Sequence, residues 1–394
     1  MKKQAILVLG LATFALVACG ENTPASTNAS HTTITVTDGI GRTLNVTPGS
    51  YQKIVCVGAG ALRTYSYIGD LNLLCGVEDI DNPAARTSSS PFGGVGRPYY
   101  DAFQEKFRDL PTAGKGGPMG MQAGVPLTEL TALQPDLIVS DYETADDAVK
   151  MEEATGAVVF TIKFGPQAIF DSKTKEVYRA LGQVLDRNER AEELLNYVSA
   201  CETEFATLTK TVTDPVTAYV AGVGNWGQKD YLATHTKYPS FVKAGVHNVV
   251  EGESLITGQG QIDISSEAWA TLGPKMEKLY FDAAGIKKTL AEYQNDKTIF
   301  NGVKAVQDGE VYVLLPYNAY YTNMEFALID TYYIFKTAYP EASASFDFEA
   351  KEKEIYQKFL GKDMTEVEAN MPGNYGGLQK VSNWTDWLDA KLAA

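Results

Sequence analysis

The sequence predicts an α/β fold of two lobes with parallel sheets, joined by a single long helix, with a ligand cleft between the lobes. Short apolar runs of strand length alternate with helical segments in both halves of the chain, which is typical of parallel sheets. Apolar residues recur at helical spacing between residues 172 and 210 and separate the two halves. A helix–proline–strand unit at residues 129–142 appears again at residues 267–284, which predicts a second lobe similar to the first.

The first lobe is expected to span residues 34–171. It begins with a hairpin, because residues 34–46 alternate apolar and polar positions around an Asp-Gly pair. Its further strands are expected at residues 53–60, 73–77, 136–140 and 157–162, with helices at residues 62–68 and 127–133. Residues 80–125 are rich in Gly, Pro and Ser and show little periodicity, so we expect a long ordered loop with a functional role there.

The turn after the strand at residues 53–60 contains Gly58-Ala59-Gly60, with Asp79 about 20 residues further on, as in dinucleotide-binding folds. Such a site needs a third glycine for close packing of the helix, and Arg63 stands at that position. We therefore interpret this segment as a tight strand-to-helix turn.

The helical segment at residues 172–212 is expected to connect the lobes, with a break near Asp186. The second lobe, residues 213–394, contains a strand at residues 217–223 that ends in a glycine-rich turn. A helix and a strand follow at residues 266–272 and 278–282. Ligands bind at the carboxyl ends of strands in open α/β sheets, so the cleft is expected where the strand ends of both lobes meet.

Composition excludes several classes of function. The formal net charge of −15 argues against nucleic-acid binding and against a basic membrane-docking face. With 3 histidines and widely spaced cysteines, no metal site is predicted. Two alternatives stay open for Cys56 and Cys75, which are either joined by a disulfide across neighbouring strands or present as buried free thiols, as is Cys201.

The N-terminus has the features of a secretory signal over residues 1–19: two lysines, an apolar run and a small-residue exit. The run is shorter than the roughly 20 residues that cross a membrane. Its exit, Leu-Val-Ala-Cys, resembles the lipobox of bacterial lipoproteins, which implies cleavage before Cys19 and a lipid on that residue. Residues 20–33 lack apolar periodicity and are expected to form a flexible tether. We therefore expect an exported protein, lipid-anchored to the cell membrane and facing away from the cytoplasm.

Four further segments carry a family resemblance: TVTDGIGRTLNV, LTALQPDLIVS, DRNERAEELLNYV and FNGVKAVQDGEVYVL. In this order, and together with residues 316–341, they resemble the substrate-binding proteins of ABC importers for ferric siderophores, haem and cobalamin. The resemblance covers about residues 34–361. It implies a two-lobed fold with limited hinge closure, and an ABC permease with its ATPase as partners. We expect a monomer that needs no cofactor and carries an iron chelate or a metal-macrocycle.

The resemblance also implies how the protein docks on the permease. In relatives, a glutamate on each lobe meets permease arginines, seven residues before the proline of the helix–proline–strand unit. Glu267 has this position before Pro274, whereas Thr128 has it before Pro135. Glu129 follows Thr128 directly, and we name Glu129 and Glu267 as the candidate docking residues.

Candidate ligand-binding residues are aromatic side chains in irregular segments, because their rings suit a bulky and partly aromatic ligand. They are Tyr99, Tyr100, Tyr142, Trp226, Tyr317, Tyr320 and Tyr321. Arg97 and Lys115 are candidates to contact anionic oxygens of the ligand. For each of these residues the alternative is a packing role.

Two other functions are compatible with parts of the sequence. Tyr317, Tyr320 and Tyr321 lie close enough in sequence to bind bare ferric iron as phenolates. An exported glycosidase would also place acids and aromatic rings in a cleft. The sequence contains no G-x-S-x-G or H-E-x-x-H motif and no histidine placed as a general base, so no catalytic residue is predicted.

Overall fold

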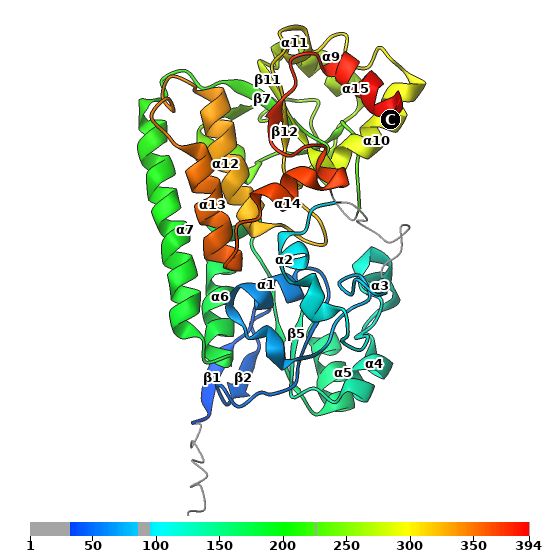
Figure 1. The fold of residues 1–394 in the computed structure, drawn as a ribbon, viewed down its shortest axis with the longest axis vertical. Helices are drawn as coiled ribbons and strands as arrows, with labels where there is room; N and C mark the ends of the chain where they lie inside the picture. Colours follow the sequence, from blue (N-terminus) through cyan, green and yellow to red (C-terminus); the bar gives the residue numbers. More distant parts are fainter. Residues whose placement is uncertain (1–31, 86–94, 225–226, 394) are drawn as a thin grey trace, which may run out of the picture. The chain divides into compact units, whose positions relative to one another are not determined.

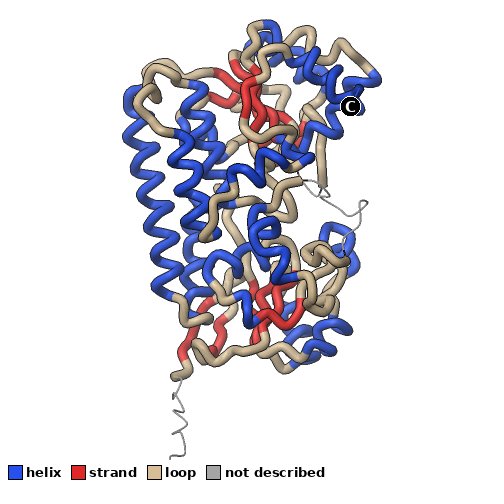
Figure 2. Tube along the Cα trace, viewed as in Figure 1, coloured by secondary structure: helices blue, strands red, loops and turns tan. Residues whose placement is uncertain are grey.

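The computed structural model describes residues 32–85, 95–224 and 227–393. The predictions for the signal peptide, for Cys19, for nearly all of the tether and for Trp226 lie outside the described residues. From Thr32 onward the chain forms one compact unit. It contains two lobes, each built on its own sheet, and Figure 2 shows the strands gathered in these two places. Among the described residues, no helix has both the length and the apolar character needed to cross a membrane.

The first lobe has a parallel sheet in the order β4-β3-β5-β6. Its strands are β3 (Ile54–Val57), β4 (Leu74–Gly76), β5 (Leu137–Ser140) and β6 (Val158–Thr161). Every residue of β3 and β5 is buried, as expected for central strands covered on both faces. The helices are α1 (Ala61–Ile68), α2 (Pro98–Phe107), α3 (Gly117–Ala123), α4 (Leu127–Leu133) and α5 (Ala145–Thr155). The predicted hairpin is confirmed as β1 (Ile34–Thr37) and β2 (Thr43–Val46).

The second lobe has a five-stranded sheet in the order β13-β12-β11-β7-β9. Its strands are β7 (Thr217–Ala221), β9 (His247–Asn248), β11 (Lys278–Asp282), β12 (Val311–Leu314) and the antiparallel β13 (Gln379–Lys380). A separate pair consists of β8 (Ala233–His235) and β10 (Gln261–Asp263). The helices are α8 (Pro239–Ala244), α9 (Ser266–Leu272), α10 (Ala283–Asn295), α11 (Lys304–Gln307), α14 (Thr365–Asn370) and α15 (Trp384–Ala393).

Four long helices lie beside one another in space, two of them between the sheets in the sequence and two after β12. They are α6 (Ser172–Val184), α7 (Asn188–Leu208), α12 (Met324–Ala338) and α13 (Phe348–Leu360). Helix α7 packs against α6 and α13, and α13 packs against α12 (Figure 1). The expected break falls between α6 and α7, where Asp186 has a φ of 55°. Nearly every residue of α12 is buried, including the acids Glu325 and Asp330.

The segment at residues 80–125, expected as a loop, contains two helices. Helix α2 begins with Pro98 in its first turn, where a proline forfeits no intrahelical hydrogen bond. The prediction took Arg97-Pro98 for a loop and so missed a helix start. It also missed α5, which Thr144 caps by accepting a hydrogen bond from the Asp147 backbone N–H. Of the two alternatives for the cysteines, free thiols are present at Cys56, Cys75 and Cys201.

A buried arginine ties the first lobe to a loop of the second. The Arg63 side chain on α1 donates from Nη1 to the Tyr320 carbonyl at 2.9 Å and from Nη2 to the Ala319 carbonyl at 2.6 Å. Its guanidinium also lies over the Tyr99 ring, 4.8 Å from the centroid. Only 1% of Arg63 is exposed. The residue that replaces the third glycine of a dinucleotide motif therefore connects the two lobes.

We expect Arg63→Met to lower the free energy of unfolding by about 2–4 kcal/mol, because two buried carbonyls lose charged donors. Urea unfolding followed by circular dichroism measures this loss. The control is Arg179→Met, which breaks an exposed pair with Glu192 and should cost less than about 0.5 kcal/mol. Equal effects of the two substitutions would contradict a special role for Arg63.

Candidate functional site

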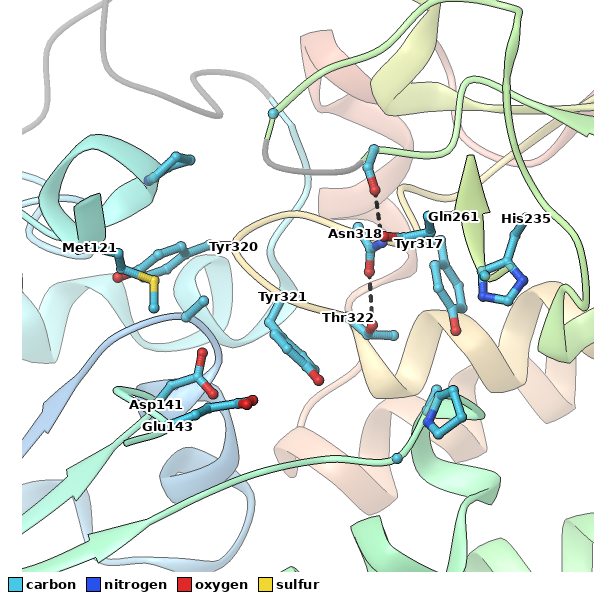
Figure 3. Close-up of a pocket in the computed structure, with 18 of the residues that line it drawn as sticks. Met121, Asp141, Glu143, His235, Gln261, Tyr317, Asn318, Tyr320, Tyr321 and Thr322 are labelled. Atoms are coloured by element: carbon cyan, nitrogen blue, oxygen red, sulfur yellow. Dashed lines mark hydrogen bonds between the residues drawn. The ribbon is translucent and has the colours of Figure 1, made fainter. Parts of the chain in front are cut away.

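A cavity of about 670 Å³ lies where strand ends of both lobes meet. Its first-lobe wall comes from the segments that follow β3, β5 and β6, together with α3. Its second-lobe wall comes from segments after β7 and β12 and from the β8–β10 pair. Its lining includes Tyr142 and the side chains of Asp141, Glu143, His235, Tyr317, Tyr320 and Tyr321, which Figure 3 labels. The cavity thus occupies the place where open α/β sheets bind ligands.

The loop after β12, residues 316–323, supplies the aromatic centre of the cavity. Asn323 closes the loop by donating from its side chain to the Pro316 carbonyl at 2.7 Å, and to the first-lobe Gly96 carbonyl at 3.1 Å. Tyr320 and Tyr321 have φ values of 56° and 75°, a left-handed backbone that costs each of them roughly 1–3 kcal/mol. Arg63 holds this backbone in place. Tyr321 consequently stands between the Asp141 side of the cavity and the Tyr317 side (Figure 3).

Tyr320 turns toward the first lobe and binds a buried acid. Its hydroxyl donates to Glu78 Oε2 at 2.6 Å, and the Gly58 backbone N–H donates to Oε1 at 3.0 Å. Burial raises the pKa of Glu78 to about 8, although both hydrogen bonds act in the opposite direction. The Glu78 proton is therefore coupled to the contact between the lobes.

His235 ends β8 and lines the second-lobe side of the cavity. Its Nδ1 accepts a hydrogen bond from the Lys237 backbone N–H at 3.1 Å, which places the proton of the neutral ring on Nε2. Burial lowers the pKa of His235 to about 4, so the ring is neutral at physiological pH. His235 therefore offers a neutral N–H donor. Metal binding through Nε2 would require the ring to give up the bond from Lys237.

The first-lobe wall is acidic. Asp141, Glu143 and Asp147 line the cavity, and none of its described lining residues is a lysine or an arginine. Lys163 pairs with Glu143 at 2.7 Å, and Lys150 pairs with Asp147 at 2.9 Å. Asp141 differs from the other two, because it is 6% exposed and its Oδ1 has no hydrogen-bond partner.

The model of the periplasmic binding protein family matches residues 95–317, more than half of the chain. The chain belongs to this family. Its lobes and cavity are therefore those of a solute-binding protein, exported from the cytoplasm, of the kind that serves ABC transporters. No curated protein is similar enough in sequence to count as a relative.

Solved structures of other periplasmic binding proteins share the fold. A periplasmic solute-binding protein of Veillonella parvula aligns with a TM-score of 0.66 and 16% identity, over 86% of this chain and 96% of its own. The molybdate-binding MolA of Haemophilus influenzae aligns with a TM-score of 0.64 and 17% identity, over 84% of this chain and 98% of its own. CeuE of Helicobacter pylori, in a Ni-His complex, aligns with a TM-score of 0.60 and 16% identity, over 86% of this chain and 99% of its own. At these identities the likeness establishes the two-lobed α/β fold.

The structure brings part of the predicted ligand-binding set to the cavity of this periplasmic binding protein. Tyr142, Tyr317, Tyr320 and Tyr321 line the cavity. The other described candidates do not line it: Arg97, Tyr99, Tyr100 and Lys115.

A competing partner explains the position of Arg97. Its guanidinium is fully buried, forms an ion pair with Asp81 and donates to the Ile80 carbonyl at 2.7 Å. Tyr99 also donates to Asp81, at 2.7 Å, and the ring of Tyr100 packs under the guanidinium. Lys115 is exposed on the surface. The two predicted cations are therefore not in position to meet anionic oxygens of a ligand in this cavity.

The docking candidates occupy similar places in the two lobes. Glu129 lies in the first turn of α4, which precedes β5, and is partly buried. Glu267 lies in the first turn of α9, which precedes β11, and is exposed. Both helix–proline–strand units are therefore present as predicted.

Sequence reasoning missed Asp141, Glu143 and His235 as cavity residues. A signal for the first two was present, because DLIVS predicts a strand and the residues after a parallel strand face the cleft. Only Tyr142 was taken from that turn. His235 had no comparable signal, since it ends the short strand β8 that no pattern indicated.

We expect Glu78→Gln to change how stability depends on pH. The folded state keeps the Glu78 proton between about pH 4.5 and pH 8, where the unfolded chain has lost it, so wild-type stability falls as pH rises through this window. The glutamine variant has no proton to lose at this position. Its free energy of unfolding, compared with that of wild type, should therefore rise by about 2–4 kcal/mol between pH 5 and pH 9. Urea unfolding at several pH values measures the difference. Glu153→Gln, at an exposed site on α5, is the control, and parallel profiles for all three proteins would refute the assignment.

Proposed function

We propose that this periplasmic binding protein captures an iron complex, such as a ferric siderophore, haem or a related metal-macrocycle, and delivers it to an ABC permease without catalysing a reaction. The observation that carries the proposal is the cavity of about 670 Å³ with Tyr142, Tyr317 and Tyr321 in its walls. Its volume lies within the range of roughly 300–1,000 Å³ that is usual for small-molecule sites. Tyrosine rings offer broad contact area with little loss of conformational entropy, which suits a bulky chelate.

Capture of a whole chelate fits the cavity better than direct binding of bare ferric iron. Within the described residues, no group of three or more His, Cys, Asp or Glu side chains is placed to hold a metal ion. Phenolate ligation by the loop tyrosines is also disfavoured. The Tyr320 hydroxyl donates to Glu78, and burial raises the pKa values of Tyr317 and Tyr321. The whole chelate is therefore the better supported cargo.

The proposal includes membrane attachment through a lipid on Cys19. Support comes from the sequence at residues 1–19, which combines a secretory signal with a lipobox-like exit. Confinement near the permease would raise the effective concentration of the receptor at its docking site. The ligand would then pass to the permease through repeated docking by a tethered protein.

We expect Tyr321→Ala to weaken binding of the chelate by about 10- to 100-fold, because the central ring of the cavity is lost. Quenching of tryptophan fluorescence on titration with ferric siderophores, haem or a corrinoid measures the affinity. Tyr197→Ala is the matched control, since this partly buried tyrosine lies on α7 and does not line the cavity. If both variants bind as tightly as wild type, the cavity is not the ligand site.

We expect Glu267→Lys to reduce ligand-dependent ATP hydrolysis by the cognate permease several-fold in proteoliposomes, while ligand affinity stays unchanged. The exposed glutamate would lose an ion pair that orients the docking encounter. Glu129→Lys tests the first-lobe contact in the same assay. Glu349→Lys, in the first turn of α13, makes the same charge change at a site outside the proposed docking surface. If Glu349→Lys reduces ATP hydrolysis as much as Glu267→Lys does, the change in net charge explains the effect and the docking role of Glu267 is contradicted.

A further inference from the structure

The Asp141 carboxyl group is buried at the wall of the cavity, and one of its oxygens has no hydrogen-bond partner. It follows β5 directly, and its backbone N–H donates to the Val57 carbonyl at 2.9 Å, which fixes its position. Only 6% of the residue is exposed, and Oδ1 has no hydrogen-bond partner. Buried polar atoms nearly always have partners, so an unpartnered oxygen at a cavity wall calls for a donor from outside the chain.

Asp141 lines the cavity, so a donor on a bound ligand would approach it from there. Close packing against the turn after β3 holds the base of the side chain, because a Cβ added to Gly58 would lie 3.0 Å from the Asp141 Cβ. The neighbouring Glu143 is an acid that lies beside Asp141 (Figure 3), and its own partner is Lys163 at 2.7 Å. Burial, with Glu143 and Glu78 adding to it and Lys163 opposing it, raises the pKa of Asp141 well above its ordinary value. A cation beside this carboxyl group would favour its ionised form and reverse that effect.

We propose that Asp141 binds a protonated amine of the cargo, so that the cavity selects positively charged metal chelates over neutral and anionic ones. This inference rests on the proposed function, and it names the class of chelate. An ammonium group supplies three donors on one small charge, which matches a single buried carboxylate. The tyrosine faces of the cavity favour a cation as well.

The rest of the cavity agrees with a cationic cargo. No lysine or arginine among the described lining residues would meet an anionic chelate, and of the three acids there only Asp141 lacks an ion pair, since Glu143 pairs with Lys163 and Asp147 with Lys150. Arg97 is engaged with Asp81 beyond the cavity wall. At the other end, the neutral His235 ring offers an N–H donor that suits the uncharged oxygens of a chelate. The two ends of the cavity therefore differ in the groups that they accept.

The experiment compares two ferric chelates that differ by one charge. Ferrioxamine B is a linear ferric trihydroxamate with a free ammonium group, and its N-acetylated form keeps the metal coordination but is neutral. We expect the full chain to bind ferrioxamine B at least about tenfold more tightly than the acetylated form. Asp141→Asn should reduce this preference to within about twofold and leave binding of the acetylated form unchanged.

Asp146→Asn is the matched control, because it removes the same charge from an exposed site on α5 that does not line the cavity. Equal binding of the two chelates by wild type, or an undiminished preference in Asp141→Asn, would overturn the inference. The melting temperature shows whether Asp141→Asn folds. If it does not fold, the preference of wild type for ferrioxamine B over its acetylated form tests the inference by itself.

Two further probes separate this inference from the proposed function. Tightest binding of the anionic ferric dicitrate would keep the proposed function and overturn the charge selection. Binding of metal-free desferrioxamine B or spermidine, lost in Asp141→Asn and without binding of any ferric chelate, would keep the cation site and overturn the proposed function. If none of the probes binds, both are overturned.

Discussion

The site depends on one buried interaction, the guanidinium of Arg63 with two carbonyls of the second-lobe loop. Those carbonyls belong to Ala319 and Tyr320. Tyr320 and Tyr321 both have a left-handed backbone, and Ala319 directly precedes them. A backbone of this kind persists only where its surroundings hold it in place. Arg63 supplies this restraint from the first lobe, and it is itself enclosed by the ring of Tyr99. The position of the Tyr321 ring in the cavity is therefore a consequence of packing on the far side of the loop.

Other polar contacts strengthen the same junction. Tyr320 reaches Glu78, and Asn323 reaches the Gly96 carbonyl, so the loop touches the first lobe at three separate places. Each contact is buried, and a buried donor or acceptor is costly to leave unpaired. A large opening of the cavity along this edge would break all three together. Movement that admits a ligand is therefore expected to keep the loop fixed to the first lobe.

The sequence was sufficient for the architecture and for part of the cavity. Strands such as DLIVS and the helix–proline–strand repeat placed Tyr142 near the cleft, because strand direction alone decides where the following residue lies. Arg97 shows the limit of this reasoning. Its partner, Asp81, lies 16 positions away across an irregular segment, and no periodicity reports such a pairing. His235 shows the same limit, since its tautomer depends on one backbone N–H two residues on.

Charge acts in the same direction at two distances in this molecule. The formal net charge of −15 attracts cations and repels anions from afar, an effect that salt screens over about 10 Å. Inside the cavity, the unpartnered Asp141 is shielded from water, and salt screens it much less. A cationic cargo would gain from both effects, in its rate of encounter and in its residence time. Added salt should therefore slow the association of such a cargo more than it speeds dissociation, whereas a neutral cargo should show neither change.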